Sequence, residues 1–250
     1  LLLEQRKALH LKVGQAIEEV FGERLHDFYG MLAYHYGKGE DFEKAEEYMI
    51  KAGEEALRSS ASSEALNFFQ EALNVYLKKC GHAADPERVA LFEKNIALAF
   101  FNKGQYAKAI KYFDSVLESW GVKSSKNRLI RTLGVFRDIS VLLKNLYLSP
   151  DTQAKQASDE RTTDIFNLSY KRTIALVFLD PERCFAELLK VIRRLNRYGV
   201  REIENGFGIW MSASGLFSWS GFSFRISNKI LEYVREDIRG DQSKELIYYN

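Results

Sequence analysis

Residues 97–116 read ALAFFNKGQYAKAIKYFDSV, and this stretch of the 250-residue chain predicts its fold. Small and aromatic side chains recur in it at helical spacing on both sides of Gly104. Small side chains let two helices approach closely where they cross, and aromatic side chains fill the space between one helix pair and the next. The stretch therefore predicts two antiparallel helices that join at Gly104 and form a hairpin.

The same pattern recurs elsewhere in the chain, in partial copies. The full set has the small, aromatic and turn residues of a tetratricopeptide unit of about 34 residues. It consists of Ala97, Phe100, Gly104, Tyr106, Ala109, Phe113 and Val116. Most of the pattern returns as Leu32, Ala33, Tyr36, Phe42, Ala45, Tyr48 and Ala52, and its second half as Ala65, Phe69 and Ala72. The copies are unevenly spaced along the chain. One explanation is that the helix expected near 41–57 belongs to two hairpins, one with the helix before it and one with the helix after it.

Apolar residues keep three- and four-residue spacing along most of the chain, and no run alternates with period two. We expect helices over residues 3–20, 23–37, 41–57, 62–80, 86–103, 106–120, 126–148, 160–178, 181–198, 201–217 and 222–239. Asp85-Pro86 and Asp180-Pro181 are expected to begin helices, because aspartate caps the first turn and proline fits it. Helices are expected to end at Gly81, Gly121, Gly199 and Gly240, since glycine accepts the left-handed conformation.

These features predict an all-α fold, namely a tetratricopeptide-like α-solenoid of antiparallel helix hairpins in two blocks. Residues 1–22 are expected to form a linker helix from an upstream module, and residues 23–148 the first block. Residues 149–160 are expected to be a loop or hinge, because Ser149-Pro150-Asp151 interrupts the helical pattern. Residues 161–250 are expected to form a truncated second block, since both ends of the chain look cut from a longer protein.

Composition argues against several classes of partner. The 36 basic and 34 acidic residues give a net charge of +2, which provides no strong field to attract nucleic acid or an anionic membrane. Cys80 and Cys184 lie far apart without a CxxC spacing, so neither a disulfide framework nor a zinc site is expected. No apolar stretch approaches the roughly 18 to 20 residues that span a bilayer. We therefore expect a cytoplasmic chain with neither a nucleic-acid nor a membrane partner.

The sequence offers no catalytic, cofactor or metal motif. A phosphate-binding loop of the form GxxxxGKS or GxxxxGKT is missing, because the sequence at 121–124 lacks the first glycine. The four histidines show neither HExxH spacing nor a nearby cysteine cluster. His35, between Tyr34 and Tyr36, is instead expected to pack at a helix crossing with one ring nitrogen hydrogen-bonded. We expect no enzyme activity from this chain and no cofactor.

Two further clusters each allow a structural and a functional interpretation. The aromatic residues Trp210, Phe217, Trp219, Phe222 and Phe224 are expected to pack in a core, or else to form an exposed interface with a next repeat or a partner. A basic stripe on the helix at 181–198 is expected to be a solvated helix face, or else to contact acidic partners or nucleotide phosphates. It contains Lys190, Arg193, Arg194 and Arg197.

The first third of the chain resembles a known family. The matching residues are Leu9-His10, Val13-Gly14, Ala16-Ile17-Glu18, Leu32-Ala33, His35-Tyr36, Asp41, Ala45, Tyr48, Lys51-Ala52-Gly53, Ala56, Glu64-Ala65, Phe69 and Ala72-Leu73. This pattern resembles the C-terminal tetratricopeptide region of bacterial multidomain signalling proteins, in which a class III adenylate or guanylate cyclase domain, or a kinase, precedes an AAA-type ATPase. The resemblance implies a role in signal transduction, as a sensing or partner-binding region that controls the upstream domains.

The expected function is that of a non-catalytic, regulatory protein-binding scaffold; the alternative is a solenoid that senses a small-molecule inducer. Its partner is expected to be another protein or an upstream domain of the same polypeptide, held on a concave face lined by the first helix of each hairpin. Repeat geometry predicts that Tyr34, Lys94, Phe101 and Asn102 face this side. The residues expected to pack the repeats are Ala33, Tyr36, Ala45, Ala52, Ala65, Phe69, Ala72, Ala97, Gly104, Tyr106, Ala109 and Phe113.

Overall fold

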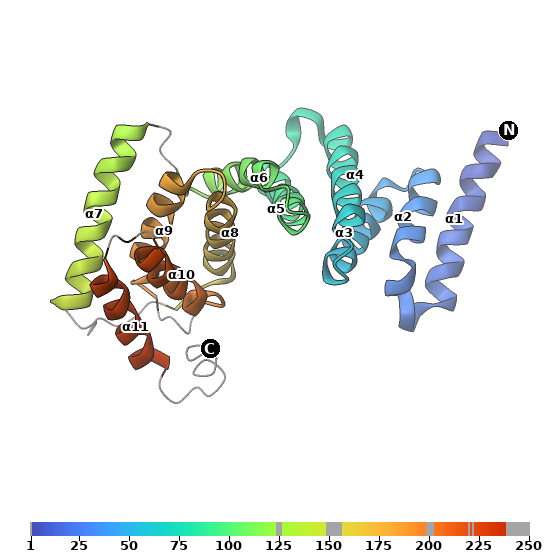
Figure 1. Cartoon of the computed structure of the whole chain (residues 1–250). Coiled ribbons are helices and arrows are strands. Elements are labelled where there is room, and N and C mark those ends of the chain that lie inside the picture. The colour runs from blue at the N-terminus through green and yellow to red at the C-terminus, as the bar shows by residue number, and fades with distance from the viewer. Residues whose placement is uncertain are drawn as a thin grey trace. The chain divides into compact units, whose positions relative to one another are not determined.

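The computed structural model describes residues 2–123, 127–148, 157–198, 203–219, 221 and 223–238. Over this part of the chain the fold is all-α, without a β-strand, and neighbouring helices pack on one another as in an α-solenoid (Figure 1). The expected fold class is therefore confirmed. The chain divides into two compact units, Leu1–Ser119 and Trp120–Asn250, which we describe separately.

The first unit is a row of helices in which each packs on the next along the chain. Its α-helices are α1 (Leu2–Val20), α2 (Tyr29–Lys38), α3 (Phe42–Arg58), α4 (Ser62–Cys80), α5 (Pro86–Asn102) and α6 (Tyr106–Ser119), with short 3-10 helices η1 (Gly22–Phe28) and η2 (Gly81–Ala83). Because α3 contacts both α2 and α4, it serves two hairpins. The short connections reverse the chain at each step, so neighbouring helices run antiparallel.

The predicted helix ends in this unit follow from local chemistry. The Asp85 side chain accepts a hydrogen bond from the Glu87 backbone N–H at 3.0 Å, and Pro86 occupies the first turn of α5. Gly81 ends α4 with φ +54°, and Gly104 turns the chain between α5 and α6 with φ +69°. A Cβ is strained at such positive φ values, which is why glycine stands at both turns.

The small and aromatic repeat residues form the core of the first unit. Side chains expected to pack the repeats are 0–5% exposed at Ala33, Tyr36, Ala45, Ala52, Ala65, Phe69, Ala72, Ala97, Ala109 and Phe113. Tyr106 is half-buried and Gly104 is exposed at the turn. The helices approach closely: a Cβ added to Gly53 of α3 would lie 2.7 Å from Cζ of Phe69 on α4. Any larger residue at position 53 would have to displace the Phe69 ring or move one of the two helices.

One expected helix begins later than the sequence suggested. Residues 22–28 form the 3-10 helix η1, with a kink at Arg24, and α2 begins only at Tyr29. The rings of Phe21 and Phe28 stack with centroids 4.2 Å apart. A continuous α-helix would place residues seven positions apart about 10 Å from each other along its axis. The stacking of Phe21 on Phe28 is therefore possible only because the backbone between them follows the kinked 3-10 helix η1 and not a continuous α-helix.

The second unit is organised around α9 (Pro181–Leu195), which packs against α7 (Arg128–Tyr147), α8 (Glu160–Leu176) and α10 (Gly206–Trp219). A further helix, α11 (Phe224–Ile238), lies against α10 and α7. As predicted, α9 begins at Pro181 after Asp180, whose side chain accepts a hydrogen bond from the Arg183 backbone N–H at 2.9 Å. Leu142, Phe166, Ile192, Trp210 and Phe217 are all at most 3% exposed in the core of this unit.

The aromatic cluster of the second unit has both of the expected environments. Trp210 and Phe217 are buried in the core, whereas Trp219 is 78% exposed and Phe224 is 66% exposed. Phe222 lies outside the described residues, as do the predicted helix ends at Gly199 and Gly240. Part of the cluster therefore packs the unit and part of it faces outward.

The expected block boundary at 148 differs from the division in the structure, which groups residues 120–148 with the second unit. The reason is that Leu142 and Leu146 of α7 are buried in one cluster with residues of α9 and α10. Of the expected hinge at 149–160, residues 149–156 lie outside the described residues, and Asp159 caps α8. The expected linker helix at 1–22 packs on α2 and buries Ile17, so it is part of the first unit.

Candidate functional site

A groove crosses α2, α3 and α4 in the first unit and has a volume of about 740 Å³. Small residues contribute to its lining, namely Gly30, Ala33 and Gly37 of α2 and Ala45 of α3. Three aromatic residues line it as well, namely Tyr34, Phe42 and Phe68. Its polar lining consists of Lys38, Glu71, Asn74 and Lys78.

The groove exists because α2 presents small residues to α3 and α4. A Cβ added to Gly37 would meet only the Cβ of Ala45, at 4.0 Å, and one added to Gly30 would lie 3.1 Å from the Phe68 ring. Larger side chains on this face of α2 would fill the space. At its edge, the Tyr34 and Phe42 side chains are 53% and 48% exposed, so apolar surface remains available to a ligand.

The groove offers both signs of charge and an amide. Lys38 lies over the Tyr34 ring, with Nζ 5.7 Å from the ring centroid. On α4, Glu71, Asn74 and Lys78 are exposed and lie at the three- and four-residue spacing that places side chains on one helix face. Within the described residues these three exposed side chains have no hydrogen-bond or ion-pair partner, so their donors and acceptors are open to a ligand.

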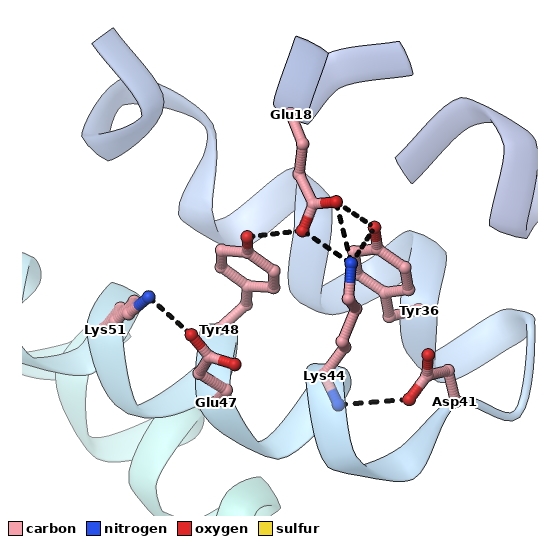
Figure 2. A network of polar contacts seen from close by, with 7 residues as sticks. All are labelled: Glu18, Tyr36, Asp41, Lys44, Glu47, Tyr48 and Lys51. Atoms are coloured by element: carbon pink, nitrogen blue, oxygen red, sulfur yellow. Dashed lines mark hydrogen bonds and ion pairs between the residues drawn. The ribbon is translucent and has the colours of Figure 1, made fainter. Parts of the chain in front are cut away.

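Behind the groove, a polar network joins α1 to α2 and α3 (Figure 2). Tyr36 and Tyr48 donate hydrogen bonds to the two carboxylate oxygens of Glu18, at 2.7 and 2.6 Å. Lys44 Nζ donates to both of these oxygens, at 3.0 and 2.8 Å, and to the Tyr36 hydroxyl at 3.0 Å. Tyr36 and Lys44 belong to other faces of α2 and α3 than the groove residues, so the network fixes these helices from behind.

The charges of this network are fixed at neutral pH. Burial raises the pKa of Glu18, but hydrogen bonds from Lys44, Tyr48 and Tyr36 outweigh it and leave that pKa below its usual value. Hydrogen bonds to Glu18 and Tyr36 raise the pKa of Lys44. Burial, followed by the hydrogen bond to Glu18, raises the pKa of Tyr48. None of these shifts brings a group close to neutral pH, so the network holds helices together and is poorly suited to proton transfer.

A second, smaller hollow of about 480 Å³ lies between α3 and α5. Ile50 and Glu54 of α3 line it, together with Arg88, Leu91 and Lys94 of α5. Arg88 forms an ion pair with the buried Glu46, and its guanidinium lies 5.1 Å from the Tyr76 ring centroid. This hollow therefore combines apolar and charged groups on the next pair of helices.

The structure separates the residues that the sequence assigned to the concave face. Tyr34 lines the first groove and Lys94 the second hollow. Phe101 packs on the rings of Tyr106 and Phe113, with centroids 5.6 and 6.1 Å away, and Asn102 is exposed at the end of α5. The residues that join Tyr34 were not predicted. The available signal was the four-residue spacing of Tyr34 with Lys38 and of Asn74 with Lys78.

His35 lies at a helix crossing, as predicted, and its Nδ1 is 3.0 Å from Nδ1 of His10 on α1. Over the described residues, no group of three or more histidine, cysteine, aspartate or glutamate side chains is arranged to hold a metal ion. Among the helices described, none combines the length and the apolar composition needed to cross a membrane.

Comparison with known proteins finds no match among protein-family models, among curated proteins or among solved structures. The functional argument for this chain therefore depends on the geometry of its own residues.

Proposed function

We propose that this chain is a non-catalytic scaffold that binds an extended segment of another protein in the groove across α2, α3 and α4. The observation that supports the proposal is the combination in one groove of a small-residue face, exposed aromatic rings and exposed polar groups on α4. Aromatic anchors supply contact area, and polar groups at known positions supply orientation and specificity.

The regulatory part of the proposal draws on the sequence resemblance to the tetratricopeptide regions of bacterial signalling proteins. In that setting the segment bound in the groove belongs to an upstream domain or to a protein that controls one. Binding then changes the output of that domain by mass action, because a ligand that prefers one state shifts the equilibrium by its difference in affinity.

The experiment is a peptide selection on the purified chain, followed by affinity measurements with the enriched synthetic peptides. The groove variant carries Lys38→Glu and Lys78→Glu, which reverse both cations of the groove. The matched control carries Lys12→Glu and Lys103→Glu, which make the same change of charge at exposed positions away from it. We expect the groove variant to lose about tenfold in affinity, or about 1.4 kcal/mol, and the control to bind normally. Equal binding by both variants, or the absence of any enriched peptide, contradicts the proposal.

A second candidate function is the sensing of a small molecule, and the size of the groove favours it. Its volume of about 740 Å³ falls in the range of roughly 300 to 1,000 Å³ that is typical of ligand sites. A thermal-shift screen tests it, since a ligand at about 100 times its Kd adds about 2.7 kcal/mol of stability. Gly37→Leu, which fills the groove, should abolish the shift caused by any true groove ligand.

A further inference from the structure

One face of α7 in the second unit is apolar and exposed. Leu129 is 75% exposed, Ile130 59%, Leu133 70% and Phe136 66%. Their three- and four-residue spacing places them in one stripe along the helix, opposite the side that buries Leu142 and Leu146. A continuous stripe of large apolar side chains in water marks an interaction surface.

The charges beside this stripe are predominantly positive. α7 carries Arg128, Arg131, Arg137 and Lys144, whereas its one acidic residue, Asp138, has a fully buried side chain. Asp138 is shared by Arg137 and Arg193, at 2.9 and 2.8 Å. Because one buried carboxylate faces two guanidinium groups, a positive charge remains in excess.

The neighbouring ion pairs have the same unequal composition. Glu182 is shared by Arg128 and Arg131, at 3.2 and 3.3 Å. Glu187 also has two cations, Arg172 and Lys190 at 2.7 and 3.0 Å, but the Arg172 and Glu187 side chains are 1% and 2% exposed, so this group lies inside the unit. Asp138 and Glu182 each face two cations, so the surface around the apolar stripe keeps a positive potential that favours an acidic partner.

The surface is also shaped to receive side chains. A hollow of about 490 Å³ lies beside Ile130, Leu133 and Gly134, with Lys123 and Lys190 among its lining residues. A Cβ added to Gly134 would have nothing within 4 Å, so the helix surface is open at this point. A separate hollow of about 430 Å³ lies on the side of α7 that faces α9 and α10, and it is lined by Val135, Phe185, Leu216 and the exposed Trp219.

The hollow beside Ile130, Leu133 and Gly134 favours a protein partner over a lipid surface. A bilayer surface is smooth at this scale and would leave this hollow unfilled. A partner helix presents side chains at three- and four-residue spacing, which enter such hollows as ridges enter grooves. Between five and six helical turns of a partner would cover the roughly 30 Å length of α7.

We propose that the exposed face of α7 around Leu129, Ile130, Leu133 and Phe136 docks an acidic amphipathic helix of a partner protein. Its apolar side chains cover the stripe and fill the hollow beside Ile130 and Leu133, and its aspartate and glutamate side chains pair with Arg128, Arg137, Lys123 and Lys144. This site is independent of the groove in the first unit.

The test uses the full chain and a synthetic helical peptide of about 18 residues, with leucine at i, i+3, i+4 and i+7 and glutamate at most other positions. A second peptide has lysine in place of every glutamate, and a third has serine in place of every leucine. We expect the glutamate peptide alone to bind, with an affinity that falls steeply as salt is raised to about 0.5 M. Equal binding of the glutamate and lysine peptides, or binding of neither, overturns the proposal.

Variants locate the site. Leu133→Asp with Phe136→Asp places charges on the exposed stripe and should weaken binding of the glutamate peptide by about tenfold or more. The matched control is Leu2→Asp with Leu9→Asp, at apolar residues of α1 that are 86% and 62% exposed, and it should bind normally. An unchanged melting temperature shows that both variants are folded.

Two further measurements test other occupants of the same face. Anionic phosphatidylserine vesicles are mixed with the wild-type chain, and sedimentation of the chain alone is measured over a range of concentrations. We expect neither vesicle binding nor self-association that depends on Leu133 and Phe136. Vesicle binding lost in the Leu133→Asp, Phe136→Asp variant would assign the face to a membrane, and self-association lost in that variant would assign it to a second copy; either result overturns the proposal.

Discussion

Nδ1 of His10 on α1 and Nδ1 of His35 on α2 lie 3.0 Å apart. At this distance one ring nitrogen must donate a hydrogen bond and the other must accept it, so at least one of the two rings is neutral at Nδ1. Burial lowers the pKa of His35, and a charge on His10 lowers it further. The contact between α1 and α2 therefore responds to pH.

Acid should weaken the first unit through this pair. Above about pH 6.5, His35 is neutral in both the folded and the unfolded chain, and its contribution to stability is fully present. As the pH falls, the unfolded chain takes up the proton first, and stability is lost until the pH passes the lowered folded pKa. His10→Gln keeps a hydrogen-bonding partner without a charge, so its melting temperature should fall less between about pH 7 and about pH 5.

The control for this experiment is His82→Gln, at an exposed histidine of η2. This variant should keep the pH profile of the wild type. If His10→Gln and the wild type lose the same stability in acid, the protonation of the His10–His35 pair does not contribute to acid unfolding.

Glu18→Gln should destabilise the first unit. The amide removes the negative charge that Lys44, Tyr36 and Tyr48 share, and it cannot accept all of their hydrogen bonds. We expect a loss of about 1–3 kcal/mol in the free energy of unfolding, measured by urea denaturation. Glu19→Gln, at the exposed neighbouring position, provides the control and should change stability by less than about 0.5 kcal/mol. A similar loss in both variants would mean that the network adds no stability of its own.

The same carboxylate gives a second acid response. Since the folded pKa of Glu18 lies below its usual value, its contribution is present above about pH 4.3. It is lost as the pH falls through the folded pKa. Glu18→Gln should therefore remove part of the loss of stability that the wild type shows below about pH 4.3.

Breaking the buried ion pair of the second unit should cost more than replacing it. Arg172 and Glu187 have side chains 1% and 2% exposed and are 2.7 Å apart. Arg172→Met leaves the buried carboxylate without this partner and should destabilise by about 3–5 kcal/mol. The double variant Arg172→Met, Glu187→Leu buries two apolar side chains instead and should be more stable than Arg172→Met alone. A double variant less stable than the single one, in urea denaturation, contradicts this account.

Adding one methyl group at Gly53 should destabilise the crossing of α3 and α4. The new Cβ of Gly53→Ala would lie 2.7 Å from Cζ of Phe69, whose side chain is fully buried. Relief requires movement of a packed ring or of a helix, at a cost of about 1–3 kcal/mol. Gly134→Ala on α7 is the opposite case, because its new Cβ would have nothing within 4 Å. Since glycine inside a helix is less stable than alanine, this variant should increase the free energy of unfolding by about 0.5–1 kcal/mol. Calorimetry measures whether Gly53→Ala lowers and Gly134→Ala raises the stability of the fold. A Gly53→Ala variant as stable as the wild type would show that the crossing of α3 and α4 can accept a Cβ.

Much of the fold could be predicted, because its signals are local. Asp85 and Asp180 precede prolines at helix starts, and Gly81 and Gly104 occupy turns of positive φ. The α2 start was missed, since the ring contact of Phe21 with Phe28 depends on the path of the chain and not on a local propensity. The candidate groove was predicted only at Tyr34, because its other polar residues come from the far end of α2 and from α4.

The sequence by itself determined the all-α fold, the helix caps and the small residues at which helices approach, because periodicity, backbone preference and side-chain size act over a few residues. Only the tertiary structure decided which side chains converge. Glu18 on α1 accepts hydrogen bonds from Lys44 and Tyr48 on α3. In the second unit, α7 buries Leu142 and Leu146 in the core while its opposite face stays exposed. Such contacts depend on the packing of whole helices against one another, and a helical pattern does not specify which neighbour will cover each face.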